Sequence, residues 1–257
     1  MFPNSPRRPM SASLFRHDAG AVVAEHAHPL GQLTIVTAGT MTLFSESGWW
    51  LAPPGRGVWV PPDVAHSARH AESSVHIRIL LDPDMAAALP NQCQTIAVSN
   101  LLRELALEAI RLSAAADQEE NATLVARMIG YEASKPTYGP VLFVPQGRDP
   151  RLVRVIDRLK SEPGDDATLE DLADLAASSP RTLARLFLSE TGMTFGRWRE
   201  HLRIVSAVDR LVRGQSITQT ALELGYRSPN SFTTMFTRIL GMPPARYLKE
   251  MREGSSS

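Results

Sequence analysis

The sequence TLEDLADLAASSPRTLARLF (residues 168–187) determines the fold of the last third of the chain, because its layout returns in SITQTALELGYRSPNSFTTMF (residues 216–236). Each stretch begins with a hydroxyl residue suited to capping a helix, places an alanine in mid-helix (Ala173, Ala221), turns, and starts a second helix at Ser-Pro. The apolar residues of each second helix recur at helical spacing, so they should pack back on the first helix. The repeat predicts two helix-turn-helix units with N-caps at Thr168, Ser179, Ser216 and Ser228.

The outer faces of the two second helices carry short polar and guanidinium groups. The first shows Arg181, Thr182, Ala184, Arg185 and Ser189, and the second shows Asn230, Ser231, Thr233, Thr234 and Arg238. Glu190 is the nearest carboxylate. The whole chain balances 27 basic against 27 acidic side chains, which excludes a uniformly basic coat, yet residues 176–252 hold 12 basic against 5 acidic. These faces suit helices that lie in the electronegative major groove of DNA.

Between the two units, residues 195–213 are expected to form one helix of roughly 28 Å. A spacer of that order could set two reading helices into successive major-groove turns, which lie ~34 Å apart. Its arginines are candidate phosphate contacts: Arg197, Arg199, Arg203, Arg210 and Arg213. The alternative reading of this third is a helical bundle with a solvated basic face.

The first part of the chain follows a different period. From about residue 13 to residue 98, short apolar runs of period two are broken by turn residues about every ten positions, which is typical of an antiparallel sandwich or barrel. Helical spacing then predicts helices over about 99–132, and residues 134–150, with four prolines and two glycines, are expected to be a linker. We therefore expect an α+β chain of two domains: residues 1–133 with a barrel and helices, and an all-helical domain at 151–257.

Cys93 is the single cysteine, which excludes an internal disulfide. The longest apolar runs fall far short of the roughly 20 residues that cross a bilayer. The first ten residues are not followed by the apolar segment of a secretory signal. These features predict a cytoplasmic protein without a membrane partner.

The stretch 168–248 resembles the double helix-turn-helix domain of the AraC/XylS family of bacterial transcription regulators. The resemblance rests on LxxLA (169–173), SPRTLxRLF (179–187), GxxF (192–195), IxxxAxxxGY (217–226), SFxxMF (231–236) and GxPPxxY (241–247). It implies double-stranded DNA as partner, RNA polymerase as a further partner of an activator, and base contacts from Arg181, Ala184 and Arg185. In the second unit the family positions fall on Pro229, Asn230, Thr233 and Thr234, where other members place arginine or glutamine. This departure predicts that the second unit reads fewer bases or mainly grips the backbone.

Two motifs of the first domain resemble the two cupin motifs: G(x)5HxH(x)3Q(x)6G over residues 20–39 and G(x)5PxD(x)2H(x)3H over residues 55–70. Gln32 stands where that family has glutamate, Asp63 where it has glycine, and His70 where it has asparagine. The resemblance implies that His26, His28, Gln32 and His66 converge inside the barrel. Alternate residues of a strand share a face, so His26 and His28 can point inward together. Such a set could hold Zn, Ni, Fe or Mn, although an amide in place of a carboxylate weakens the site.

Three readings of the barrel histidines stay open: a divalent metal site, a polar lining for a small-molecule effector without metal, and a satisfied structural cluster. For the effector reading, the candidate contacts are His26, His28, Gln32, His66 and Trp59, whose ring could stack on the effector.

The combined expectation is a one-component sensor and not an enzyme. An effector in the barrel would change how the first domain docks on the DNA-binding domain, with activation and repression both open. The AraC resemblance also implies a homodimer through the helical segment after the barrel, and we expect its contacts at Leu101, Leu105 and Leu112. The alternative is a metal-dependent cupin enzyme with an accessory helical domain.

Overall fold

The computed structural model describes residues 8–115, 118–136 and 142–254. The chain divides into two compact units, which we describe separately. Among the described residues, one unit holds residues 8–43, 52–136 and 251–254, and the other holds Phe44–Leu51 and residues 142–250.

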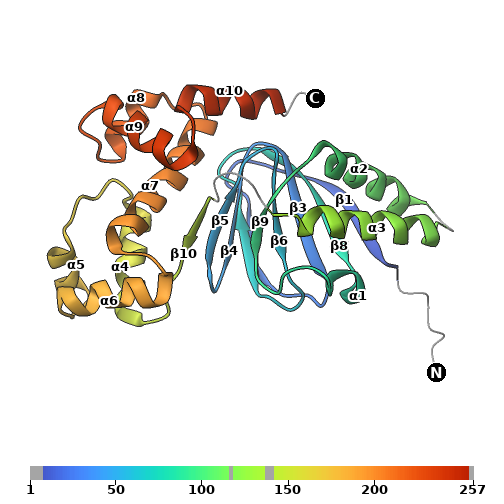
Figure 1. Ribbon diagram of the computed structural model, residues 1–257, viewed down its shortest axis with the longest axis horizontal. Coiled ribbons are helices and arrows are strands. Elements are labelled where there is room, and N and C mark those ends of the chain that lie inside the picture. Colours follow the sequence, from blue (N-terminus) through green and yellow to red (C-terminus); the bar gives the residue numbers. More distant parts are fainter. Residues whose placement is uncertain (1–7, 116–117, 137–141, 255–257) are drawn as a thin grey trace. The chain divides into compact units, whose positions relative to one another are not determined.

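The strands form two five-stranded sheets, with the orders β1-β8-β3-β6-β9 and β10-β5-β4-β7-β2 (Figure 1). Every strand pair whose register is resolved is antiparallel. This architecture confirms the expected antiparallel sandwich. The strands of the described residues are β1 (Met10–His17), β2 (Val22–His26), β3 (Gly31–Ala38), β4 (Met41–Ser45), β5 (Gly48–Ala52), β6 (Arg56–Val60), β7 (His66–Arg69), β8 (Ser74–Leu81), β9 (Gln94–Ala97) and β10 (Phe143–Pro145).

The sheet that contains β8 has two different faces. Ile77 and Ile79 belong to an apolar core with helix residues, whereas the alternate residues His76 and Arg78 line a cavity on the other face. β3 follows the same rule, since Leu33 and Ile35 belong to the core. The period-two pattern therefore separates a helix-covered face from a polar interior.

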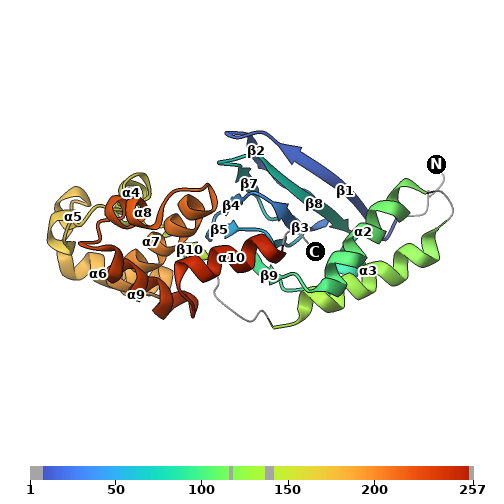
Figure 2. The same ribbon diagram turned by 90° about the horizontal axis from the view of Figure 1, so that it is seen from above.

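Three helices accompany these strands: α1 (Pro83–Ala86), α2 (Asn100–Ala114) and α3 (Glu119–Ser134). Figure 2 shows α2 and α3 side by side along this sheet, and residues of both helices join its core. Ser99 caps α2 and also donates a hydrogen bond of 2.8 Å to Glu132 of α3. The expected helices over 99–132 are thus present, with a break between them.

The structure corrects the expected dimer contacts. Leu105 and Leu112 lie in the core of this unit, with 8% and 3% of their surface exposed, because they face the sheet. Of the three expected residues, Leu101 alone is exposed. A dimer through α2 therefore cannot use Leu105 or Leu112 without unfolding the unit.

The second unit is mainly helical. Its helices are α4 (Pro150–Ser161), α5 (Leu169–Leu175), α6 (Pro180–Thr191), α7 (Phe195–Val212), α8 (Ile217–Glu223), α9 (Pro229–Leu240) and α10 (Pro244–Gly254). A difference from the expected linker is β10, which pairs with β5. This pairing brings Phe143 onto Trp50, with ring centroids 4.6 Å apart.

Trp198 of α7 ties the helices of this unit to its β5 segment. Its indole Nε1 donates to the carbonyl oxygen of Pro145 at 2.9 Å, and its ring meets Trp49 edge-on at 6.3 Å. The ammonium of Lys160 lies 4.3 Å from the Trp49 ring. Trp49 therefore packs among aromatic and cationic groups of the helical unit.

In the part of the chain that the structure describes, no helix combines the length and the apolarity that crossing a membrane requires.

Candidate functional site

The two helix-turn-helix units share their local geometry. The expected N-caps Thr168, Ser179, Ser216 and Ser228 all accept a hydrogen bond from a backbone N–H in the first turn of their helices. Ala173 and Ala221 are buried, as the close helix crossing requires. These caps fix where each second helix begins, and so which residues it presents.

The turns between the paired helices also match. Ala177 in the first unit and Gly225 in the second both take positive φ values, 46° and 77°. The next residue donates in each case to the carbonyl oxygen of the mid-helix alanine, at 3.0 Å in the first unit and 2.9 Å in the second. The first helix-turn-helix unit thus holds an alanine in a backbone conformation that glycine prefers.

Helix α6 presents an open cationic face. Arg181, Ala184 and Arg185 are exposed, and Thr182 is half-buried beside the Ser179 cap. Neither arginine has a hydrogen bond or ion pair among the described residues, so both guanidinium groups remain available. The Glu190 carboxylate does not pair with these arginines, because it accepts hydrogen bonds from the backbone N–H groups of Arg148 and Asp149.

Helix α9 presents a neutral face. Asn230 and Thr234 are exposed, and Pro229 and Thr233 are half-buried. The Thr234 hydroxyl donates to the carbonyl oxygen of Asn230 at 3.0 Å. Arg238 is exposed but ion-paired with Glu200 of α7 at 2.7 Å, so it is less available than the arginines of α6.

Most of the α7 arginines hold the unit together. Arg199 donates to the carbonyl oxygen of Ala167 at 2.9 Å, and Arg203 donates to those of Pro163 and Asp165. Arg210 forms an ion pair with Glu223, and Arg213 forms one with Asp209. Arg197 is exposed. Of the five candidate phosphate contacts, Arg197 is the one without an internal partner among the described residues.

The N-terminal unit, which contains the sandwich, brings three expected site residues together: His26, His28 and His66, which we call the His26 triad. Each offers a ring nitrogen, and these atoms lie within 4.8 Å of one another. His26 lies directly opposite His66 in the β2–β7 pair, beside a bulge that shifts the register after Val23. The strand ends at His26, so His28 reaches the site from the following loop and not through strand alternation as expected.

The hydrogen bonds of the His26 triad orient its free nitrogens. The Nδ1 atom of each ring lies 2.8–2.9 Å from a backbone carbonyl oxygen: that of Ala24 for His26, Leu30 for His28 and Val64 for His66. A proton on Nδ1 makes these hydrogen bonds and leaves Nε2 with a lone pair. The rings are tilted by 49–84° to one another. Histidines that bind metals show this arrangement, in which the second ring nitrogen donates to a carbonyl.

Two polar groups of the His26 triad lack a matched partner. His66 Nε2 is buried and has no hydrogen-bond partner among residues 8–115, 118–136 and 142–254, and burial lowers the pKa of His66. His28 Nε2 faces Gln32 Oε1 at 3.1 Å, so with the proton on Nδ1 both atoms are acceptors. A cation between them, or an exchanged orientation of the Gln32 amide, satisfies both. The residues present therefore fit a divalent metal bound by three imidazoles and one amide oxygen.

Asp63 keeps the backbone of the second cupin-like motif. Its φ is 61°, in the left-handed region where the related family has glycine. Aspartate tolerates this region better than most residues do. The departure at position 63 therefore preserves the turn that leads into His66.

The cavity beside the His26 triad measures about 90 Å³. It is also lined by Arg78 and by His17, His70 and His76, which we call the His76 cluster. Of these residues, the resemblance to the cupin motifs concerned only His70, which stands where that family has asparagine. For His76 and Arg78 the signal is the alternation of β8, in which these two residues share one face and Ile77 and Ile79 share the other.

Trp59 does not belong to this cavity. Its side chain is fully buried in the core, its Nε1 donates to the carbonyl oxygen of Pro90 at 2.8 Å, and a Cβ on Gly31 would lie 2.2 Å from its ring. The expected stacking of Trp59 on an effector is therefore contradicted, because the ring faces the helix-covered side of the sheet.

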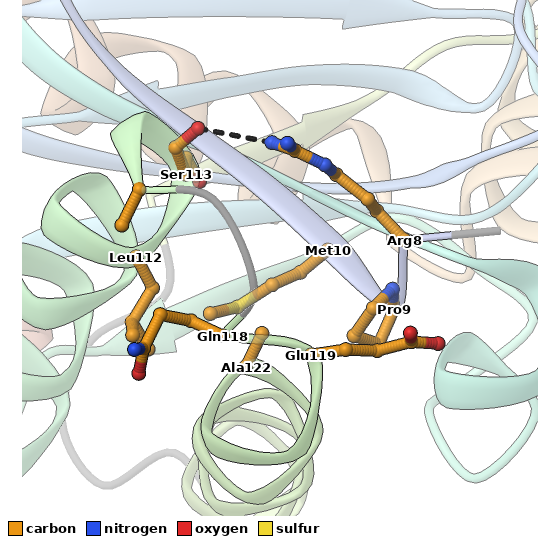
Figure 3. A pocket seen from close by; sticks show the side chains of 9 residues that line it. Arg8, Pro9, Met10, Leu112, Ser113, Gln118, Glu119 and Ala122 are labelled. Atoms are coloured by element: carbon orange, nitrogen blue, oxygen red, sulfur yellow. Dashed lines mark hydrogen bonds between the residues drawn. The ribbon is translucent and has the colours of Figure 1, made fainter. Parts of the chain in front are cut away.

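A second hollow of about 190 Å³ lies where the start of β1 meets α2 and α3 (Figure 3). Arg8 donates to the carbonyl oxygen of Ser113 at 3.0 Å, and the Ser113 hydroxyl accepts from the Ala12 backbone N–H. These bonds join β1 to α2. The hollow therefore lies at the contact between β1 and the two helices, where Arg8 and Ser113 already hydrogen-bond to protein groups.

Sequence comparisons match both units. Residues 8–129 match a family described as an AraC-like ligand binding domain, and residues 172–250 match a helix-turn-helix domain. The chain is 30% identical to the HTH-type transcriptional regulator NimR of Escherichia coli over 226 residues, which are 88% of this chain and 82% of that protein. It is 35% identical to the HTH-type transcriptional regulator RipA of Corynebacterium glutamicum over 99 residues, 38% of this chain and 30% of that one. A crystal structure of ToxT from Vibrio cholerae aligns with a TM-score of 0.41 at 13% identity, covering 95% of this chain and 99% of that one.

Proposed function

Because the chain belongs to the AraC family of HTH-type transcriptional regulators, we propose that α6 and α9 are its two DNA-reading helices and that the histidine-lined cavity is its effector site. It is a DNA-binding regulator with an N-terminal ligand-binding domain. A protein of this kind acts on the chromosome, so we place it in the cytoplasm.

The observation that carries the DNA assignment is the contrast between the two reading faces. Arg181 and Arg185 are separated by one helical turn, exposed and without internal partners among the described residues. Bidentate contact of arginine with guanine is the commonest specific contact in the major groove. The α9 face offers Asn230, Thr233, Thr234 and Pro229, with Arg238 held by Glu200. We therefore assign base reading mainly to α6 and backbone contact mainly to α9.

The cavity is assigned to a metal-assisted sensor. His26, His28, His66 and Gln32 would hold the ion, which would supply open coordination positions for a ligand atom of the effector. The carbonyl partners of the three rings fix the tautomer in which each Nε2 accepts. The protein's part is thus to hold neutral nitrogen ligands in place and to keep the surrounding cavity small.

The enzyme alternative places the same residues in a catalytic cupin with an accessory helical domain. NimR and RipA, two of the relatives that match the chain, are named as HTH-type transcriptional regulators. A regulator needs the DNA-reading surface, whereas a catalytic cupin does not. We therefore propose a sensor and not an enzyme, and a metal-loaded protein that binds DNA specifically supports this choice.

Helix α3 carries the surface that we assign to a homodimer. Leu124, Met128 and Tyr131 are exposed at positions i, i+4 and i+7, so they form one apolar stripe along the helix. Leu101 and Leu107 of α2 are exposed as well. A second copy of this chain is the occupant we propose, because paired AraC-like domains would present two DNA-binding units. RNA polymerase is the further partner of an activator.

The test of the function is capture of genomic fragments by the full-length protein at physiological salt. We expect a small set of fragments to be retained against random competitor DNA. The Arg181→Ala/Arg185→Ala double variant should lose this selectivity while it keeps its fold. Equal retention of all fragments by the unmodified protein would contradict the proposal.

A further inference from the structure

The His76 cluster shares the cavity of the His26 triad but has a different geometry. Its rings are nearly parallel, with angles of 8–11° between them and centroids 4.1–5.6 Å apart. Phe15 lies across the β1–β8 pair from His76 and stacks on it at 5.6 Å. The result is a block of parallel aromatic rings at one side of the cavity.

Parallel rings do not fit a shared metal ion. The lone pair of an imidazole nitrogen lies in the plane of its ring, so three ligands of one ion need planes that intersect at the ion. The tilted rings of the His26 triad meet this condition, whereas stacked rings in separate parallel planes do not. We therefore assign no metal ion to the His76 cluster, although its nitrogens also lie within 4.8 Å of one another.

Arg78 is the fixed positive charge of this cavity. Its guanidinium lies over the Phe15 ring, 4.1 Å from the centroid, and the side chain is partly buried. Among the described residues it has no carboxylate partner, and the residues that line the cavity include no aspartate or glutamate. A partly buried cation without a counter-ion favours an anionic ligand, because desolvated charges are stable mainly when paired.

Two buried imidazole nitrogens add hydrogen-bonding capacity. Within the part of the chain that the structure describes, His70 Nε2 and His76 Nδ1 have no hydrogen-bond partner, and these residues are 0% and 6% exposed. The Ser74 hydroxyl lies 2.7 Å from His70 Nδ1, and when it donates there, His70 carries its proton on Nε2. Burial lowers the pKa of His70 to about 4 and that of His76 to about 3, so both rings are neutral near pH 7 and each offers one N–H.

We propose that the cavity binds a small monocarboxylate, whose carboxylate oxygens are held by the guanidinium of Arg78 and by the buried N–H groups of His70 and His76. This inference rests on the proposed sensor function and names the class of its effector. The planar fork of arginine matches the two oxygens of a carboxylate. The cavity volume of about 90 Å³ restricts the acid to a few heavy atoms or a single ring.

The test is calorimetric titration of the full chain with sodium acetate and sodium benzoate, and with the neutral isosteres acetamide and benzamide, at constant ionic strength in chloride. At least one acid should bind, and its amide should bind at least tenfold more weakly. Arg78→Gln should weaken binding of the acid by about 10- to 100-fold, as expected for a lost charge-assisted contact. Arg78→Lys keeps the positive charge but lacks the planar guanidinium. Its affinity for the acid should lie between that of the unmodified protein and that of Arg78→Gln.

Arg16→Gln is the matched control, because Arg16 is exposed on β1 next to His17 and its removal changes the charge equally. It should bind the acid as the unmodified protein does. The His26→Ala/His28→Ala variant should still distinguish acid from amide, which separates the Arg78 subsite from metal ligation. Thermal melts of each variant establish that the fold is kept.

Binding of neither acid, equal binding of acid and amide, or unchanged acid binding by a folded Arg78→Gln variant would each overturn the assignment. Selective DNA retention without added acid is measured on the same preparations of the unmodified protein and of Arg16→Gln, which should retain the same fragments. A protein that retains DNA but binds no acid thus refutes the effector class alone, whereas loss of selective DNA retention in the unmodified protein refutes the proposed function.

Discussion

Replacing Arg185 by alanine tests the reading role of α6 with a clean separation of binding from stability. The side chain is exposed and has no internal partner among the described residues, so its truncation should change the free energy of unfolding by less than about 0.5 kcal/mol. A lost bidentate base contact costs about 1–3 kcal/mol, which is roughly a 5- to 150-fold weaker affinity for the specific site. Fluorescence anisotropy with a selected DNA fragment, at several salt concentrations, measures this loss.

The salt dependence shows which contact was lost. If Arg185 reads a base, the slope of log K against log salt stays constant and the preference relaxes at one base pair. If it binds a phosphate, the slope changes by about 0.9 and the affinity falls for all sequences. Arg246→Ala is the control, because Arg246 is already paired with Glu250 on α10. An Arg185→Ala protein with unchanged affinity and base preference at fixed salt refutes the assignment of α6.

Three further predictions follow from the two units. Purified protein should carry about one divalent metal per chain by mass spectrometry, and His26→Ala/His28→Ala should carry none; equal content in both proteins removes the His26 triad as ligand set. Ala177→Gly should raise the free energy of unfolding by about 0.5–1 kcal/mol in urea, because φ at this residue is 46°; Gly225→Ala should lower it, since the new Cβ would lie 2.6 Å from the Gly164 carbonyl oxygen. Leu124→Glu/Met128→Glu should sediment as a folded monomer while the exposed control Val22→Glu stays dimeric, and a dimeric double variant contradicts the α3 interface.

The helical unit was largely predictable from the sequence because its signals are local. Four N-caps and two Ser-Pro starts fix the beginnings of α5, α6, α8 and α9 within a residue. The roles of the α7 arginines were not predictable in this way. Arg199 and Arg203 bind carbonyl oxygens of the 163–167 segment, which lies more than 30 positions away along the chain. A charge pattern does not show which cations have distant acceptors.

The cavity shows the same division between local and long-range information. The spacing of the two motifs correctly brought His26, His28 and His66 together, because both motifs contribute to one strand pair and its adjoining loop. The His76 cluster joins residues of β1 and β8, which are neighbours in one sheet, with His70, which follows β7 of the other sheet. The sequence does not show how the two sheets face each other. Trp59 was misplaced because strand alternation gives two faces without saying which one the helices cover. Leu105 was misplaced for a related reason, since helical periodicity does not distinguish a core face from a dimer face.

A hydroxyl-radical footprint of the full-length protein on a selected fragment tests most directly that α6 and α9 enter successive turns of the major groove. The two helices flank the 18-residue α7, which spans about 27 Å. We predict two protected segments per subunit whose centres lie about 10 base pairs apart. The segment that depends on Arg185 should lose protection in Arg185→Ala while the other keeps part of its own. Protection of a single segment, or equal protection of random DNA, would contradict the account.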